Sequence, residues 1–260
     1  MMRLLQLSDL HLFADPAMRL KGIPTRETLA DVLAHIDAHE SDVDQFIITG
    51  DLTHDEKLET YQAVRSMLGD KVQRCRILPG NHDDRSVMRQ AFPDAVAGES
   101  GPLMFSTSAD GWRLIGLDSH LPGHVPGRIE PEQLEWLGGE LKTHADEPTA
   151  LFLHHPPIPV GVPWMDRIGL QDPEAFCGLV ESSPQVKLVV CGHVHHEFSG
   201  RLGNATVFTT PSTGVQFVPA GEKPDFAADP PGYRVIEFDG GTYQTRAVRL
   251  PEVKYTPVAD

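Results

Sequence analysis

Oxygen and imidazole side chains recur along this chain, each group directly after a short apolar run. The groups are Asp9-Leu10-His11, Gly50-Asp51, Gly80-Asn81-His82-Asp83, His154-His155 and Gly192-His193-Val194-His195-His196. Mixed carboxylate and imidazole donors suit Mn, Fe, Co or Zn, whereas Ca²⁺ and Mg²⁺ prefer oxygen ligands. Each group alone means little, because Asp, Asn and Gly also favour turns and paired histidines can be buried packing residues. Their joint occurrence in this order indicates a metal site.

The number of donors indicates two metals. Two aspartates, one asparagine and four histidines supply the candidate ligands, namely Asp9, His11, Asp51, Asn81, His154, His193 and His195. This number of ligands is greater than the four that a single tetrahedral zinc ion would use. If Asp51 bridges, each of two metals receives four protein ligands and keeps positions for water and substrate. Two metals ~3.5–4 Å apart can hold a bridging hydroxide and clamp a transferring phosphoryl group, so the predicted chemistry is phosphate ester hydrolysis.

The apolar runs that precede these groups predict buried strands at 4–7, 45–49, 76–78, 150–153 and 186–191. The carboxyl ends of strands in an open α/β sheet converge on one edge, where ligands bind. Apolar spacing predicts three helices: one that Thr25 caps, one over 56–68 and one that starts at Pro131. Turn dipeptides at 110–111, 203–204 and 240–241 predict hairpins. These elements favour a mixed α/β layered sandwich with one core.

The composition restricts the partners and the compartment. The 22 Lys+Arg against 37 Asp+Glu give a formal net charge of −15, which argues against a polynucleotide partner. A small anion can still bind where metal supplies a local positive centre. No run approaches the ~20 apolar residues of a membrane span, and the N-terminus has no signal-peptide core. We therefore expect a cytoplasmic protein with a single domain over 1–260 and no membrane partner; a dimer is one option for its oligomeric state.

At the donor groups the sequence resembles the calcineurin-like metallophosphoesterase family, whose motifs are D-x-H, G-D, G-N-H-D/E, H and G-H-x-H. The resemblance implies a four-layer α-β-β-α sandwich of two mixed sheets flanked by helices, with a binuclear site of two transition metals, iron and manganese foremost. It assigns one metal to Asp9, His11, Asp51 and His195, and the other to Asp51, Asn81, His154 and His193. It also places His82 against the substrate phosphate, and Asn81 beside it is a second candidate for substrate contact. His155 and His196 fall outside the ligand pattern and are interpreted as residues that either support the ligands from behind or pack in the core.

Three further segments resemble the bacterial class III cyclic-nucleotide phosphodiesterases of this family, namely 11–14, 157–166 and 210–217. The resemblance implies hydrolysis of 3′,5′-cyclic AMP or a close cyclic nucleotide to the 5′-monophosphate by a metal-bridging hydroxide. His82 is the candidate acid for the leaving oxygen. Trp164 and Phe217 are candidates for contact with a base, and packing on the core is an equal alternative for both. Other readings are a broader small-diester hydrolase acting on glycerophosphodiesters or 2′,3′-cyclic nucleotides, a DNA nuclease and a non-catalytic scaffold.

Overall fold

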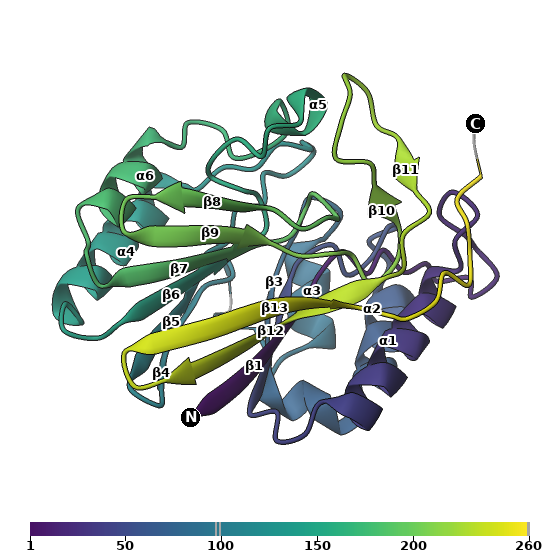
Figure 1. Ribbon diagram of the computed structural model, residues 1–260, viewed down its shortest axis with the longest axis horizontal. Helices are drawn as coiled ribbons and strands as arrows, with labels where there is room; N and C mark the ends of the chain where they lie inside the picture. The colour runs from purple at the N-terminus through teal and green to yellow at the C-terminus, as the bar shows by residue number, and fades with distance from the viewer. Residues whose placement is uncertain (97, 99, 259–260) are drawn as a thin grey trace.

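Two mixed β-sheets lie face to face in the computed structural model, and helices cover their outer faces (Figure 1). The structure describes residues 1–96, 98 and 100–258. The strands of the first sheet are β1 (Met2–Leu7), β2 (Gln45–Thr49), β3 (Cys75–Leu78), β12 (Gly232–Asp239) and β13 (Thr242–Arg249). Their order is β13-β12-β1-β2-β3, and β1, β2 and β3 run parallel. Three ligand-bearing strand ends therefore point the same way.

The second sheet carries the remaining ligand-bearing strands. Its members are β4 (Phe105–Ala109), β5 (Trp112–Gly116), β6 (Thr149–Leu153), β7 (Val186–Cys191), β8 (Ser199–Leu202) and β9 (Ala205–Thr209). Their order is β4-β5-β6-β7-β9-β8, and β5, β6, β7 and β9 run parallel. A separate pair, β10 (Gln216–Phe217) and β11 (Phe226–Ala227), rises beside the short helix α5 (Pro163–Asp166) at the top of Figure 1.

Alternation along the strands divides the core into three apolar layers. Leu5 and Leu7 of β1 pack toward the helices of their own sheet, whereas Leu4 faces Phe152 of the second sheet. This follows because successive strand side chains point to opposite faces. The helices are α1 (Thr25–His39), α2 (Leu58–Leu68), η1 (Gly69–Arg74) and α3 (Arg85–Ala91) on one side, and α4 (Pro131–Thr143) and α6 (Glu174–Glu181) on the other. The predicted four-layer α-β-β-α sandwich is confirmed.

The predicted strands, hairpins and helices are confirmed, with their ends shifted by no more than two residues. The predicted N-cap at Thr25 is wrong. Pro24 precedes the helix, and the Thr25 hydroxyl donates to the carbonyl of His11 at 2.9 Å. Thr25 is already the first residue of the helix, so it cannot hold the N-cap position, and its hydroxyl instead connects α1 to a candidate ligand loop. Among the described residues, no helix has the length and apolar character that a bilayer span requires.

Candidate metal centre

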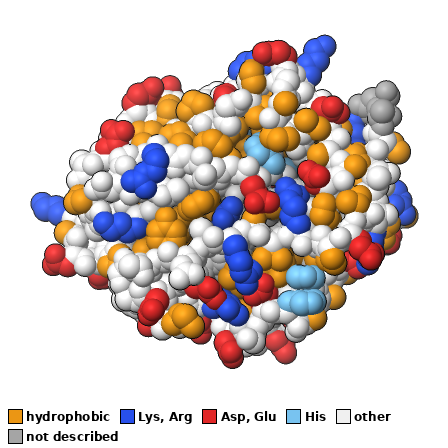
Figure 2. Space-filling model, viewed as in Figure 1, with side chains coloured by type: hydrophobic (Ala, Val, Ile, Leu, Met, Phe, Trp, Pro, Cys, Tyr) orange, Lys and Arg blue, Asp and Glu red, His pale blue; other side chains and the backbone are white. Residues whose placement is uncertain are grey.

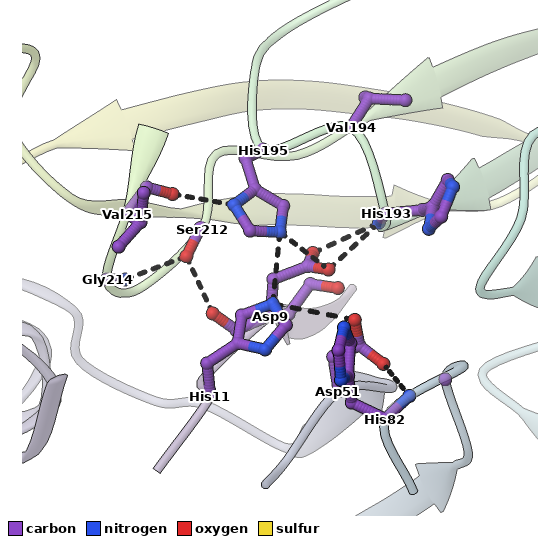
Figure 3. A network of polar contacts seen from close by, with 12 residues as sticks. Asp9, His11, Asp51, His82, His193, Val194, His195, Ser212, Gly214 and Val215 are labelled. Atoms are coloured by element: carbon purple, nitrogen blue, oxygen red, sulfur yellow. Dashed lines mark hydrogen bonds and ion pairs between the residues drawn. The ribbon is translucent and has the colours of Figure 1, made fainter. Parts of the chain in front are cut away.

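The candidate ligands follow five strands, three of the first sheet and two of the second, and they meet at one edge of the sandwich. Figure 3 shows Asp9, His11, Asp51, His193 and His195 of this group. β1 leads to Asp9 and His11, and β2 leads to Asp51. Backbone hydrogen bonds join these two loops, because the amide of Asp9 donates to Gly50 and that of His11 to Asp51. β3 leads to Asn81, β6 to His154, and β7 to His193 and His195. The structure thus brings all seven predicted ligands together.

One ligand group surrounds the ends of β1 and β7. Nε2 of His11 lies 3.1 Å from Nε2 of His195, and the latter lies 3.3 Å from Oδ1 of Asp9. Oδ2 of Asp51 lies 3.5 Å from Nε2 of His11. These four side chains are buried, so the donor atoms face one another and not bulk water. They are the four residues that the resemblance assigns to the first metal.

A second ligand group lies on the other side of Asp51. Nε2 of His154 is 3.5 Å from Oδ2 of Asp51, 3.3 Å from Oδ1 of Asn81 and 3.3 Å from Nδ1 of His193. Oδ2 of Asp51 is therefore equally distant from one imidazole nitrogen in each group. This position between the two groups is the one that a bridging carboxylate requires.

The hydrogen bonds behind the imidazoles leave their inward nitrogens free to bind a cation. Nδ1 of His154 faces the carbonyl of Thr49 at 2.6 Å, and Nδ1 of His195 faces that of Val215 at 2.7 Å. A carbonyl can only accept, so both rings carry their proton on Nδ1 when neutral, and Nε2 keeps its lone pair. His193 contributes Nδ1 to the second ligand group, and its buried Nε2 has no hydrogen-bond partner among the described residues. Several lone pairs converging in a buried space fit two transition-metal ions.

The charges of the group are mutually dependent. Burial alone would raise the pKa of Asp9, but His195 and His154 outweigh it and the pKa lies at about 2. Burial likewise opposes ionisation of Asp51, yet His154 and His11 hold its pKa well below the usual range. Burial would lower the pKa of His154, but Asp51 and Asp9 raise it to about 9. In the metal-free protein the protonated His154 ring therefore partly offsets the two carboxylates, as a bound cation would.

The backbone at the ligands is strained. Asp9, His11, Asp51, His193 and His195 all have φ between 48° and 69°, in the left-handed region that non-glycine residues rarely occupy. Strain of this kind persists where the surrounding structure enforces it, and it concentrates at functional sites. Here the backbone amide of His193 holds both carboxylate oxygens of Asp9 at 3.1 Å, which helps to enforce the bend.

Two glycines of the motifs are required by close approach to the carboxylates. A Cβ on Gly80 would lie 2.1 Å from Oδ1 of Asp51, and a Cβ on Gly192 would lie 2.9 Å from Oδ2 of Asp9 and 2.0 Å from the hydroxyl oxygen of Ser8. Contacts shorter than 3.0 Å force atoms to move. The carboxylates therefore occupy the space that a side chain on these glycines would need.

Gly80→Ala is expected to weaken metal binding and to lower stability by ~1–3 kcal/mol, the usual cost of forcing an extra methyl group into a packed site. Thermal unfolding and chelator competition measure the two effects. Gly139→Ala is the matched control, because a Cβ at this exposed position in α4 meets no atom within 4 Å. That variant should be as stable as the wild type or slightly more so. Unchanged metal affinity in Gly80→Ala would contradict the close approach.

His82 lies beside the ligand groups without belonging to them. Its backbone amide donates to Oδ1 of Asp51 at 2.8 Å, and its half-buried ring lies edge-on to His11 with centroids 5.1 Å apart. The amide thus fixes the loop, and the ring is left to line the cleft above the ligands.

Two residues next to the ligand groups were not singled out from the sequence as participants in the centre. Buried Asp83 accepts hydrogen bonds from the amides of Leu52 and Gly80, which ties the loops after β2 and β3 together, and from the hydroxyl of Tyr61. Burial, together with repulsion from Asp51, raises the pKa of Asp83 to about 7. The other is His54, which contacts His11 and His82. The D/E position of the motif was a signal for Asp83, and no sequence signal distinguishes His54.

The two histidines outside the ligand pattern, His155 and His196, form hydrogen bonds with other groups of the protein. The ring nitrogens of His155 contact the hydroxyl of Ser119 at 2.8 Å and the carbonyl of Val125 at 3.0 Å. Nδ1 of His196 contacts the carbonyl of Val194 at 2.7 Å. Both rings are buried, and these contacts agree with their interpretation as supporting or packing residues.

A cleft of about 840 Å³ opens above the ligands. Phe217 and Phe226 form one wall, and Phe217 also packs on His195 with ring centroids 4.4 Å apart. Trp164 borders the cleft but is 7% exposed and sits in an apolar cluster behind Phe217. Arg167 bonds to the side chain and carbonyl of Glu222, joining the two segments that form the rim.

A model of the calcineurin-like phosphoesterase family matches residues 2–197, which include all seven ligand candidates. The chain belongs to this family. Its members are hydrolytic enzymes with a dinuclear metal site, and the clustered Asp and His side chains of this phosphoesterase provide the donors for one.

Individual relatives agree with the family. The chain is 34% identical to the 3′,5′-cyclic adenosine monophosphate phosphodiesterase CpdA of Pseudomonas aeruginosa over 97% of this chain and 91% of the relative. It is 31% identical to the glycerophosphodiester phosphodiesterase GpdQ of Enterobacter lignolyticus over 82% of this chain and 77% of the relative. The fold is similar to that of a dimetal phosphatase from Danio rerio, with a TM-score of 0.65, 16% identity and coverage of 95% and 98%.

Proposed function

We propose that this phosphoesterase hydrolyses a 3′,5′-cyclic nucleotide, cyclic AMP foremost, to the 5′-monophosphate. The observation that carries the proposal is the placement of two ligand groups, joined by Asp51, on the floor of a cleft of about 840 Å³. Ligand sites are typically clefts of ~300–1,000 Å³ with apolar walls and few convergent polar groups. Near full-length similarity to the CpdA enzymes supports the choice of nucleotide.

The residues divide the work between metal binding and substrate binding. Two bound transition-metal ions, iron and manganese in our proposal, would supply a water nucleophile at neutral pH and Lewis-acid stabilisation of the phosphoryl oxygens. Asp9, His11, Asp51 and His195 would hold one ion, and Asp51, Asn81, His154 and His193 the other. His82 donates a ring N–H to the phosphate and protonates the leaving 3′-oxygen.

The aromatic wall is proposed to receive the nucleobase. Phe217 and Phe226 have ring centroids 5.4 Å apart and extend from His195 toward the rim. Trp164 supports Phe217 edge-on, with centroids 5.0 Å apart, and contributes through that ring because its own surface is buried. The face shown in Figure 2 carries interspersed basic and acidic side chains, and the formal net charge is −15, as expected for a small substrate and not for duplex DNA.

A substrate panel on metal-loaded protein tests the proposal. We expect kcat/KM for cyclic AMP to exceed that for glycerophosphodiesters by at least ~10-fold, since a stacked base adds ~1–3 kcal/mol of binding that the glycerol compounds lack. The similarity to GpdQ makes glycerophosphodiesters the second candidate substrates. Preference for the glycerol compounds would overturn the nucleotide proposal and leave the metal centre intact.

Phe217→Ala is expected to raise KM for cyclic AMP by ~10–100-fold through loss of base stacking. Hydrolysis of a small chromogenic diester without a base should change little. Metal content must be measured in parallel, because Phe217 also packs on His195. Equal losses on both substrates at full metal occupancy would mean that the ring supports the centre and does not bind the base.

A further inference from the structure

An additional imidazole, His54, lies between two side chains of the proposed centre. Its Nδ1 is 3.5 Å from Nδ1 of His11, and its ring stacks on His82 with centroids 4.7 Å and planes 22° apart. Phe13 packs against the same ring at 5.0 Å. The amide of His54 donates to the carbonyl of Leu12 at 2.8 Å, so the loops after β1 and β2 fix its place.

The contact with His11 bears on metal binding. His11 can bind a cation through Nε2, the atom in the first ligand group, only when that nitrogen carries no proton. The proton of the neutral ring then resides on Nδ1 and faces Nδ1 of His54, which has to accept it. In His154 and His195 a backbone carbonyl is the acceptor. Partners of this kind fix the tautomer and orientation of a ligating imidazole.

The contact with His82 bears on the substrate. The near-parallel stack on His54 limits the angles that the His82 ring can adopt. The ring of His11, which meets His82 at a steep angle, restricts it from a second side. His54, His82 and His11 also line the same cleft. A ring that must meet a phosphate within hydrogen-bond reach gains from being held in place before substrate arrives.

We propose that His54 is a positioning residue with two separable tasks: its Nδ1 holds the metal-binding tautomer of His11, and its ring face holds His82 toward the phosphate. The second task rests on the proposed function, whereas the first requires only metal binding. Neither task makes His54 a ligand, since the seven candidate ligands form both groups without it.

Two substitutions separate the tasks. His54→Asn keeps an acceptor near the position of Nδ1 and removes the ring, whereas His54→Phe keeps the stacking ring and removes the acceptor. We expect His54→Phe to weaken metal binding by ~10–100-fold, the usual effect of losing a partner behind a ligand. We expect His54→Asn to bind metal nearly as tightly as the wild type and to lower kcat by ~10-fold for a substrate with a poor leaving group.

Metal affinity is measured by isothermal titration and chelator competition. The turnover number kcat is measured at saturating metal with a generic chromogenic diester and with a second diester that has a poorer leaving group. His39 takes the same two substitutions as a control, because it is exposed in the last turn of α1, stacks on His35 with ring centroids 4.1 Å apart and lies outside the cleft. Circular dichroism of the metal-free variants checks the fold.

Equal metal loss in both His54 variants would overturn the proposal, because it would identify His54 as a ligand. Wild-type affinity and kcat in both would overturn it as well. If the wild type binds two metals and cleaves the chromogenic diester but not cyclic nucleotides, the proposed substrate fails while both tasks of His54 remain measurable.

Discussion

Asp51→Asn is expected to lower kcat/KM by roughly 10³–10⁵-fold, equivalent to ~4–7 kcal/mol of transition-state stabilisation. The reason is geometric: Oδ2 of Asp51 lies 3.5 Å from an imidazole nitrogen of each ligand group. Replacing this carboxylate by a neutral amide removes negative charge from both metal sites at once. Elemental analysis should show about two metals per wild-type chain and a lower content in the variant.

Asp42→Asn is a closely matched control for this change. Asp42 has φ of 54°, against 53° for Asp51, and it is exposed and outside the cleft. The same substitution in the same backbone region should therefore leave turnover and metal content unchanged. Full metal occupancy with retained activity in Asp51→Asn would show that the bridge lies elsewhere.

His82→Ala is expected to lower kcat by ~10²–10⁴-fold, the usual span for lost acid–base assistance, with metal content near normal. The ring lies beside the ligand groups and lines the cleft, while the backbone amide that contacts Asp51 is retained in alanine. A diester whose leaving group needs no proton should recover part of the rate. The measurement compares kcat of the variant and of the wild type on diesters with good and with poor leaving groups.

His124→Ala serves as the control for His82, because this exposed ring contacts a carbonyl of its own loop. Equal loss for good and poor leaving groups would mean that His82 stabilises charge without donating the proton. Loss of metal in His82→Ala would contradict its placement outside the ligand groups.

The ligand-bearing strands could be predicted because their sequence signals are local. Runs such as 45–49 and 186–191 are short, largely apolar and followed by a glycine and then a donor, and the topology of parallel strands then brings their ends together. The hairpins were predictable for a similar reason, since Asp110-Gly111 already carries the turn geometry, with positive φ at both positions.

Contacts behind the ligands could not be predicted, because they depend on where loops pass in space. The stacking of His54 on His82 joins residues from different loops, and nothing in their spacing indicates it. The hydroxyl of Thr25 illustrates the same limit: its sequence position fits an N-cap, and tertiary contact with His11 determines its hydrogen bond instead. The burial of Trp164 behind Phe217 likewise follows from the packing of two distant loops.

The left-handed backbone of five candidate ligands has an evolutionary consequence. Such a conformation costs an L-residue of ordinary shape ~1–2 kcal/mol, a cost that glycine avoids and that asparagine and aspartate partly avoid. Replacement by glycine would therefore relieve backbone strain at Asp9, His11, Asp51, His193 and His195, so stability alone does not retain these five side chains. A lineage that had become a scaffold would be expected to lose these side chains early. Their joint presence in this chain is what continued selection for catalysis would leave behind.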